Sequence, residues 1–308
     1  MIQKKHSFFA DIRRNPFSYC LVLPAAIYVL LFSYLTLPYM LMAFQNYHFQ
    51  TGLFHSPWVG LKNFAFFFKS NRAGLVTWNT IWLNFLFITS GTVGSVVLAL
   101  MLNEVRQKRY LKVTQSLMLF PNFLSWIIVA YIVYAFLSTG NGWLYQIIES
   151  FGGKPVSMYS KASYWPPILV IIKLWKGVGM NSVIYMASMT GIDEGLYEAA
   201  RIDGANKFQE IRHITLPLIM PTVCIMTLLA VGKIFYGDFQ MIYALVGDNG
   251  ILMQTTDVID TYVFRALRQT GDPSGAMAVG VYQAFVGFIM VYGSNWLVKK
   301  NFPDGAIF

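Results

Sequence analysis

The sequence is organised around long runs that contain no charged residue. Five such runs, of 28, 25, 25, 19 and 23 residues, are Phe17–Phe44, Trp78–Leu102, Val113–Leu137, Ile214–Gly232 and Ala276–Val298. A helix needs about 20 apolar residues to cross the hydrocarbon core of a bilayer. Each run is therefore long enough, or nearly so, to cross a membrane as a helix.

A sixth candidate span runs from Trp165 to about Ile192 and is apolar except for Lys173 and Lys176. Only 12% of the 308 residues are charged, which is about half the share that is usual in soluble domains. A chain whose solvent is lipid does not need a charged surface. The sequence therefore predicts an all-α, polytopic membrane protein with six transmembrane helices. Kinks are expected at the prolines within the spans, which are Pro24, Pro38, Pro121 and Pro221.

The charged residues between the spans are distributed unevenly. The net charge is +9, but the basic residues form short clusters between the apolar runs, which predicts no nucleic-acid partner. If the N-terminus is cytoplasmic, thirteen lysines and arginines lie in cytoplasmic segments and seven lie in outer segments. This excess predicts that both termini are cytoplasmic. The expected organisation is a cytoplasmic arm at 1–16, a membrane domain at 17–300 and a cytoplasmic tail at 301–308.

The loop at 193–217, between the fourth and fifth spans, has the signals of two short helices joined by a hinge. Asp193 and Glu194 would place negative charge at the first helix N-terminus, where the helix dipole favours it. Gly204 stands where the chain can adopt a left-handed conformation after that helix. Asn206 and Gln209 have the spacing of a capping box at the start of the second helix. These signals fit either an ordinary amphipathic connector or a compact docking surface for another protein.

This loop resembles the EAA motif of bacterial ABC importer permeases, which reads Glu-Ala-Ala, three residues, Gly, nine residues and Ile-x-Leu-Pro. The alignment needs no insertion or deletion from Glu198 to Pro217. The resemblance implies that the loop is a coupling helix, which docks on a cytoplasmic ATPase. The residues expected to carry the coupling are Glu198, Ala199, Ala200, Asp203, Gly204, Leu216 and Pro217.

Three further segments, Trp175–Ala187, Thr256–Phe264 and Ala276–Gly280, are similar to the branch of that family that imports complex polysaccharides and oligosaccharides. The resemblance implies the type I importer permease fold in a bacterial plasma membrane. It also implies a second permease subunit, two cytoplasmic ATPases and an extracellular solute-binding lipoprotein that delivers an oligosaccharide. The ATPases would bind ATP and Mg, and we expect no cofactor in this chain.

Two other classes of protein could have a polytopic chain. A secondary transporter or a channel would not need ATP, but ion-coupled carriers place acidic residues within their spans, and the six spans contain none. A membrane enzyme would need a nucleophile–base pair or a metal cluster, and the sequence has neither pattern. The chain also lacks the Gly-x-x-x-x-Gly-Lys-Ser/Thr phosphate loop. Energy for transport is therefore expected to enter from a partner at the EAA-like loop.

The substrate pathway is expected on the fourth span, the fifth span and the outer segment that follows. The spans carry three charges, Lys173, Lys176 and Lys233, each of which either faces a cavity or extends to the outer headgroups. Lys176 is the stronger functional candidate of the three, and Lys233 is the one most expected to reach the headgroups. The predicted pathway residues are Trp175, Lys176, Asn181, Tyr185, Tyr236, Asp238 and Gln240. Asn181 and Tyr185 are four residues apart and therefore share a helix face.

Overall fold

The structure is a computed structural model that describes residues 14–105, 107–153 and 156–301. The described residues form helices and turns, with one isolated β-bridge between Gln45 and Trp58. The all-α prediction is therefore confirmed. Most of the predicted arm and almost all of the predicted tail lie outside the described residues.

Five helices in the described ranges are long and apolar enough to cross a membrane, and they cover Pro16–Phe44, Ala73–Asn103, Ala162–Met189, Lys207–Val231 and Pro273–Lys300. The remaining predicted span, the third along the chain, is broken. Its two halves, Lys108–Phe123 and Trp126–Leu137, are bent by 98° relative to each other. Pro121 lies at the end of the first half, where its ring removes a backbone donor and favours a helix break. The third span is thus a bent pair of helices rather than one rod.

The chain divides into two compact units. The first unit comprises the chain up to Phe66 together with Asp272–Val281. Its elements are α2 (Pro16–Val29), the π-helix η1 (Leu30–Tyr34), the 3-10 helix η2 (Leu37–Phe44), α3 (Gly52–His55) and α4 (Lys62–Phe68). The Asn63 side-chain amide donates to the carbonyls of Ala43 at 2.9 Å and Gln45 at 2.8 Å, which fixes α4 against the end of η2.

The second unit comprises Phe67–Gly271 and the chain from Tyr282 onward. Its membrane-length helices are α5 (Ala73–Asn103), α9 (Trp165–Met189), α12 (Leu216–Val231) and most of α16 (Pro273–Asn301). The shorter elements are α6 (Lys108–Leu119), η3 (Phe120–Phe123), α7 (Trp126–Leu137), α8 (Trp143–Ser150), η4 (Met158–Ser160), η5 (Ala162–Tyr164), α10 (Glu194–Ile202), α11 (Lys207–Glu210), η6 (Ile211–Thr215), α13 (Phe239–Val246), α14 (Met253–Thr256) and α15 (Ile259–Thr270).

Glycines let α9 approach its neighbours closely. A Cβ added to Gly179 would lie 2.0 Å from the carbonyl oxygen of Met118 in α6. A Cβ added to Gly94 in α5 would lie 3.3 Å from a methyl group of Val178. The absence of a side chain at Gly179 is therefore what permits the backbones of α6 and α9 to touch.

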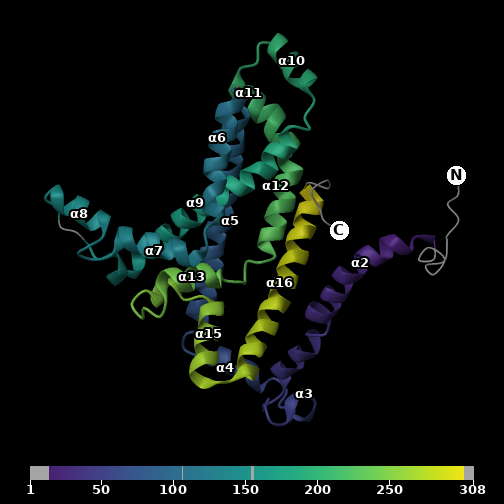
Figure 1. Cartoon of the computed structure of the whole chain (residues 1–308), viewed down its shortest axis with the longest axis vertical. Helices are drawn as coiled ribbons and strands as arrows, with labels where there is room; N and C mark the ends of the chain where they lie inside the picture. Colours follow the sequence, from purple (N-terminus) through teal and green to yellow (C-terminus); the bar gives the residue numbers. More distant parts are fainter. Residues whose placement is uncertain (1–13, 106, 154–155, 302–308) are drawn as a thin grey trace. The chain divides into compact units, whose positions relative to one another are not determined.

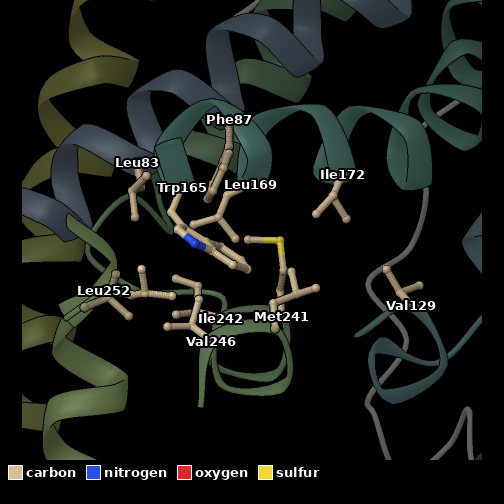
Figure 2. Close-up of a cluster of buried hydrophobic side chains, with 12 residues drawn as sticks. Leu83, Phe87, Val129, Trp165, Leu169, Ile172, Met241, Ile242, Val246 and Leu252 are labelled. Atoms are coloured by element: carbon tan, nitrogen blue, oxygen red, sulfur yellow. The ribbon is translucent and has the colours of Figure 1, made fainter. Parts of the chain in front are cut away.

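An apolar cluster of the second unit surrounds Trp165 at the start of α9 (Figure 2). Trp165 is fully buried, and its indole N–H donates to the carbonyl of Met158 at 3.1 Å. Helix α5 contributes Leu83 and Phe87 to this cluster, and α13 contributes Met241 and Ile242. The cluster fixes α13 to the α5–α9 pair, next to the cavity described below.

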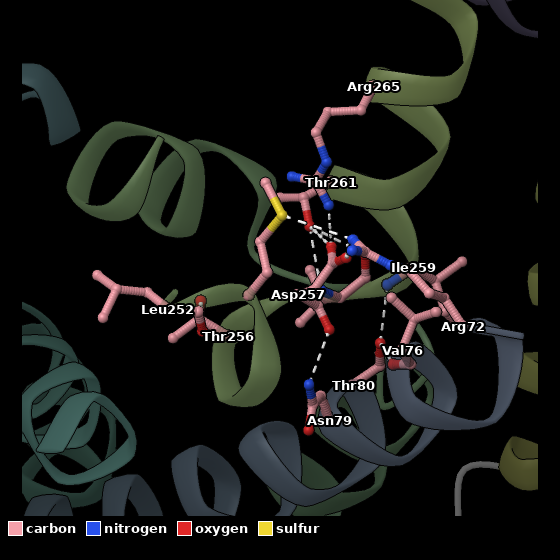
Figure 3. A network of polar contacts seen from close by, with 12 residues as sticks. Arg72, Val76, Asn79, Thr80, Leu252, Thr256, Asp257, Ile259, Thr261 and Arg265 are labelled. Carbon is pink, nitrogen blue, oxygen red and sulfur yellow. Dashed lines mark hydrogen bonds and ion pairs between the residues drawn. The ribbon is translucent and has the colours of Figure 1, made fainter. Parts of the chain in front are cut away.

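Helix α5 has a different segment of the chain at each of its ends (Figure 1). The segment that contains α14 and α15 lies at the start of α5, and α10 and α11 lie at its end. A polar network joins α5 to the first of them (Figure 3). Asp257 is 2% exposed, forms an ion pair with Arg265 and accepts a hydrogen bond from Thr261 at 2.9 Å. Its backbone carbonyl accepts from the side chain of Asn79 in α5 at 3.2 Å. The network therefore pins the α14–α15 connection to the first turns of α5.

Candidate functional site

A cavity of about 720 Å³ lies among α5, α9, α12 and the start of α13. Five of the seven predicted pathway residues line it, namely Asn181, Tyr185, Tyr236, Asp238 and Gln240. The structure therefore brings together predicted residues from the fourth span and from the segment after the fifth span. Their role as pathway residues remains a prediction.

The contribution of α9 to the cavity follows one helix face. Lys173, Asn181 and Tyr185 all line the cavity and are spaced by multiples of four residues. An α-helix advances about 100° per residue, so Trp175 lies on the face opposite Lys173. Trp175 indeed lines a separate hollow between α5, α6 and α9.

Lys176 was the stronger functional candidate among the lysines, but the structure places it outside the cavity lining. Its ammonium donates to the carbonyls of Asn122 at 2.8 Å and Leu124 at 2.6 Å, and to that of Pro121 at 3.2 Å. These carbonyls lie at the break in the third span, where the regular helical hydrogen bonds end, and that of Pro121 also accepts from the Leu124 N–H at 3.2 Å. Lys176 therefore stabilises the bend between α6 and α7, and the cavity charges come from other lysines.

The fifth span stops at Val231 and the chain turns through residues 232–238 before α13 begins. Asn84 of α5 holds this turn, because its side-chain amide donates to the carbonyls of Ile234 and Tyr236, both at 3.0 Å. Asp260 of α15 accepts from the Gly237 N–H and from the Gln283 amide. Burial raises the pKa of the Asp260 carboxyl, and these two donors act in the opposite direction. The irregular turn is thus tied to three other helices.

The turn is also crowded at one glycine. A Cβ added to Gly237 would lie 2.5 Å from a methyl group of Val258 and 3.0 Å from the Asp260 carboxylate. Only glycine fits there without a shift of its neighbours. This close approach places Tyr236 and Asp238, on either side of Gly237, in the cavity lining.

The cavity lining contains three charged residues in the described chain, which are Lys173, Lys233 and Asp238. Lys173 and Asp238 form an ion pair. The Lys173 ammonium also lies 5.7 Å from the Phe87 ring centre and 5.8 Å from that of Trp126, at cation–π distance. Asp238 in turn accepts from the Met241 N–H at 3.2 Å and so caps α13. The Lys173–Asp238 ion pair therefore helps to position α13. Lys233 is the remaining charged residue of the lining and is not part of this pair.

Sequence reasoning did not select three of the lining residues, Asn84, Lys173 and Lys233. The four-residue spacing from Lys173 to Asn181 and Tyr185 was a signal that could have identified Lys173. Asn84 gave no signal, because its partners are 150 and 152 residues away in the sequence. The sequence left open whether Lys233 faces a cavity or reaches the headgroups, and in the structure this residue is part of the cavity lining.

The EAA-like loop forms at the other end of α5 and α12, and its local geometry is as predicted. Asp193 caps α10 by accepting from the Gly195 N–H at 3.0 Å. Gly204 has a φ of +83° and ends that helix in a left-handed conformation. Asn206 and Gln209 form the predicted capping box, with bonds of 3.0 and 2.7 Å.

The second predicted short helix is instead the beginning of the fifth span. Helix α11 continues through the π-helix η6 directly into α12, so that Lys207–Val231 is one apolar span. The wide π-turn lies immediately before Pro217, whose ring would clash with a carbonyl in a regular helix interior. The π-turn therefore lets the helix pass the proline without breaking, and the hinge is confined to Gly204 and Ala205.

Ion pairs and hydrogen bonds connect α10 to the start of the fifth span. Arg201 donates to Glu210 at 2.8 Å. Lys207 forms ion pairs with Glu210 at 3.0 Å and with Glu104, the residue that follows α5, at 3.3 Å. The hydrogen bond and charge of Glu210 raise the pKa of Arg201, which therefore stays protonated. Tyr197 and Thr215 share a hydrogen bond of 2.9 Å.

The predicted coupling residues occupy different faces of this loop. Glu198 lines a hollow of about 580 Å³ between α10, the end of α5, α11 and η6, together with Arg201 and Glu104. A second hollow of about 330 Å³ lies on the other side, and Ala200, Asp203 and Gly204 line it. Ala199 is exposed on α10, and Leu216 and Pro217 begin α12.

Two large apolar side chains that sequence reasoning did not select, Ile202 and Phe208, are 86% and 69% exposed in this region.

Residues 91–301 match the protein family described as the binding-protein-dependent transport system inner membrane component. The matched region contains α9, the EAA-like loop, α12 and α16. The chain belongs to this family.

Two proteins of Bacillus subtilis (strain 168) are similar to this permease over almost its whole length. Protein LplB is 32% identical over 97% of this chain and 93% of its own length. The polygalacturonan/rhamnogalacturonan transport system permease protein YteP is 33% identical over 98% of this chain and 94% of its own length.

Two solved structures are also similar to this permease over almost its whole length. One is a crystal structure of a bacterial ABC transporter involved in the import of the acidic polysaccharide alginate, with 32% identity and a TM-score of 0.86 over 95% of this chain and 98% of that one. Another is a bacterial alginate ABC transporter in complex with an alginate pentasaccharide-bound periplasmic protein, with 31% identity and a TM-score of 0.85 over 96% of this chain and 98% of that one. The expected importer permease fold is therefore confirmed.

Proposed function

We propose that this permease forms one half of the pathway of an ATP-driven importer for an oligosaccharide that an extracellular solute-binding protein delivers. The observation that carries this proposal is the position of the cavity relative to the EAA-like loop. Helix α5 and the continuous helix Lys207–Val231 both line the cavity, and the end of α5 and the start of Lys207–Val231 line the hollow beside the loop. Similar proteins are named for polygalacturonan and for alginate, which are both saccharides.

The cavity lining has the chemistry that a saccharide needs. Asn181 and Gln240 offer amides that both donate to and accept from sugar hydroxyls. Tyr236 is 40% exposed and offers an apolar ring face and a hydroxyl. Tyr185 also lines the cavity, but it is 3% exposed and belongs to an apolar cluster, so it supports the cavity wall. A site that combines a few polar groups with apolar walls is typical of small-molecule binding.

The continuous helix from Lys207 to Val231 supplies a mechanical connection. A partner ATPase that docks on α10 would move Arg201 and Tyr197, which are bonded to Glu210 and Thr215 of that helix. Movement at the loop would then be transmitted along α12 to the turn at residues 232–238. ATP and Mg belong to the ATPases in this proposal, and the chain contributes the coupling residues Glu198, Ala199, Ala200, Asp203, Gly204, Leu216 and Pro217.

The rest of the assembly follows from the same proposal. A second, homologous permease would line the other side of the pathway in the bacterial plasma membrane. The EAA-like loop and both termini would be cytoplasmic, with residues 1–16 as an arm and 301–308 as a tail. The α13–α15 segment would face the binding protein.

Purification and reconstitution test the proposed function. The tagged chain, purified from its native host in detergent, should carry a second permease and an ATPase. The assembly in liposomes should take up an oligosaccharide only when both ATP and the binding protein are present. Glu198→Lys should abolish uptake and binding-protein-stimulated ATP hydrolysis without loss of the assembly, because it reverses the charge presented to the ATPase. Uptake that is independent of ATP would refute the proposal.

A further inference from the structure

Lys233 is the charged residue of the cavity lining that has no ion-pair partner among the described residues. The cavity lining contains Lys173, Asp238 and Lys233, and the first two form an ion pair. Within the described residues the Lys233 side chain makes no hydrogen bond and no ion pair. The lining therefore has a net charge of one positive unit, located at the turn that follows α12.

The position of Lys233 is fixed by the turn rather than by its own side chain. Its backbone N–H donates to the Ala230 carbonyl at 3.0 Å, and its carbonyl accepts from the Tyr236 N–H at 2.9 Å. Asn84 and Asp260 hold the next residues of the turn, as described above. Lys233 is thus held in the cavity lining by a backbone that is anchored on both sides.

A substrate that fills this cavity displaces water from Lys233. An ammonium that loses water without gaining a negative partner is strongly penalised. A neutral sugar would leave this charge uncompensated, whereas a carboxylate would form a charge-assisted hydrogen bond with it. Discrimination would thus come both from attraction of the acid and from the penalty on the neutral sugar.

We propose that Lys233 is a specificity-determining residue that selects acidic oligosaccharides, by pairing with a uronate carboxylate in the cavity. A uronic acid carries its carboxylate on the same ring as its hydroxyls. A uronate in this cavity therefore offers a carboxylate to Lys233 and hydroxyls to the amides of Asn181 and Gln240, which line the same cavity. This inference rests on the proposed function and adds the chemical class of the substrate.

The test uses the complete importer with its partner permease, ATPases and binding protein in liposomes. The probes are a trigalacturonate and its carboxyl-reduced counterpart, which has the same length and no charge. The variants are Lys233→Gln, which removes the charge, and Lys233→Arg, which keeps it. The matched control is Lys69→Gln, because Lys69 is exposed and lies outside the cavity lining.

We expect Lys233→Gln to lower uptake of trigalacturonate about tenfold, since a hydrogen bond to a charged group is lost. Lys233→Arg and Lys69→Gln should stay within about twofold of the unaltered importer. Binding-protein-stimulated ATP hydrolysis should persist in all three variants, because the EAA-like loop is unchanged. Lys233→Gln should also lower uptake of the acid more than that of the neutral trisaccharide.

Three results would overturn the inference while leaving the proposed function standing. One is unchanged trigalacturonate uptake by Lys233→Gln, which would assign the charge to lipid headgroups. Another is an equal loss for the acidic and neutral trisaccharides, which would indicate that Lys233 pairs with the second permease. The third is ATP-dependent uptake of the neutral probe and not of the acid. Failure of the proposed function itself is distinct, since it would appear as the absence of any ATP-dependent oligosaccharide uptake.

Discussion

The EAA-like loop at 193–217 and the turn at 232–238 lie at the two ends of α12 and are stabilised in different ways. The loop is capped by bonds between residues two or three positions apart, such as Asp193 to Gly195 and Asn206 to Gln209. The turn is held by Asn84, which is 150 residues away, and by Asp260, which is 23 residues away. The comparison shows that one end of this helix has a locally determined geometry and the other has a geometry imposed by packing.

The two ends of α12 also differ in the reason why each contains a glycine. Gly204 has a φ of +83° and open space around it, so the backbone conformation alone requires glycine. Gly237 has crowded surroundings, so the available space requires glycine. Substitutions that differ in size and in backbone preference should therefore act differently at the two positions.

The largest effect is expected from Gly204→Pro. Proline fixes φ near −65° and cannot adopt the +83° of Gly204, and it removes the N–H that donates to the Arg201 carbonyl at 3.1 Å. We expect loss of transport and of binding-protein-stimulated ATP hydrolysis in an assembly that still forms. Gly204→Asn is the control, because asparagine tolerates the left-handed region, and it should retain most of the uptake. Normal uptake by the proline variant would show that the hinge is not required for coupling.

A smaller but clear effect is expected from Gly237→Ala. The added methyl group meets Val258 at 2.5 Å, and overpacking of this kind costs about 1–3 kcal/mol. The detergent-solubilised protein should unfold at a lower temperature, as measured by a thermal shift. Val258→Ala should restore part of the loss in a double-mutant cycle. Additive effects of the two substitutions would contradict a direct contact.

A third effect, of about 1–2 kcal/mol, is expected from Asn84→Ala, which leaves two carbonyls of the turn without a donor. Asn84→Asp has the same shape but turns lone pairs toward these carbonyls, and it should be more damaging than alanine. Both variants should raise the KM for uptake, because the turn carries Lys233, Tyr236 and Asp238. Equal KM values for all three proteins would mean that Asn84 does not position the cavity lining.

The smallest effect is expected from Arg201→Gln in the loop. Arg201 is half exposed, and Lys207 remains bonded to Glu210 after the substitution. Uptake at physiological salt should change by less than about twofold, because exposed ion pairs contribute little and are screened. The measurement is the uptake rate at low and high salt, and the difference between the two proteins should shrink as salt rises. A large loss would show that the Tyr197–Thr215 hydrogen bond does not transmit the ATPase movement without Arg201.

Helix location and the caps of the loop were predictable from the sequence because their causes are local. Uncharged runs predicted the spans, and the signals at Asp193, Gly204 and Asn206 predicted the geometry that the structure shows. The single error in this region was the second short helix, because the π-turn before Pro217 keeps the helix continuous. A proline signal alone does not distinguish a break from a bulge.

The cavity was only partly predictable. The four-residue spacing of Asn181 and Tyr185 correctly placed both on one face of α9. The partners of the lysines could not be read from the sequence, because Lys176 is bonded to carbonyls 52 to 55 residues away and Lys173 to Asp238, 65 residues away. Hydropathy assigns each lysine the same cost of insertion, whatever its partner.

The sequence by itself determined the all-α membrane class, the family and the local geometry of the EAA-like loop, since these depend on apolar length and on bonds between neighbours in the chain. The tertiary structure decided which lysine faces the cavity, where the third span bends and why the turn after α12 keeps its shape. The physical reason is that irregular backbone in a membrane protein must find its hydrogen-bond partners on other helices. Asn84, Lys176 and Asp260 supply those partners, and packing alone brings them to the places where they are needed.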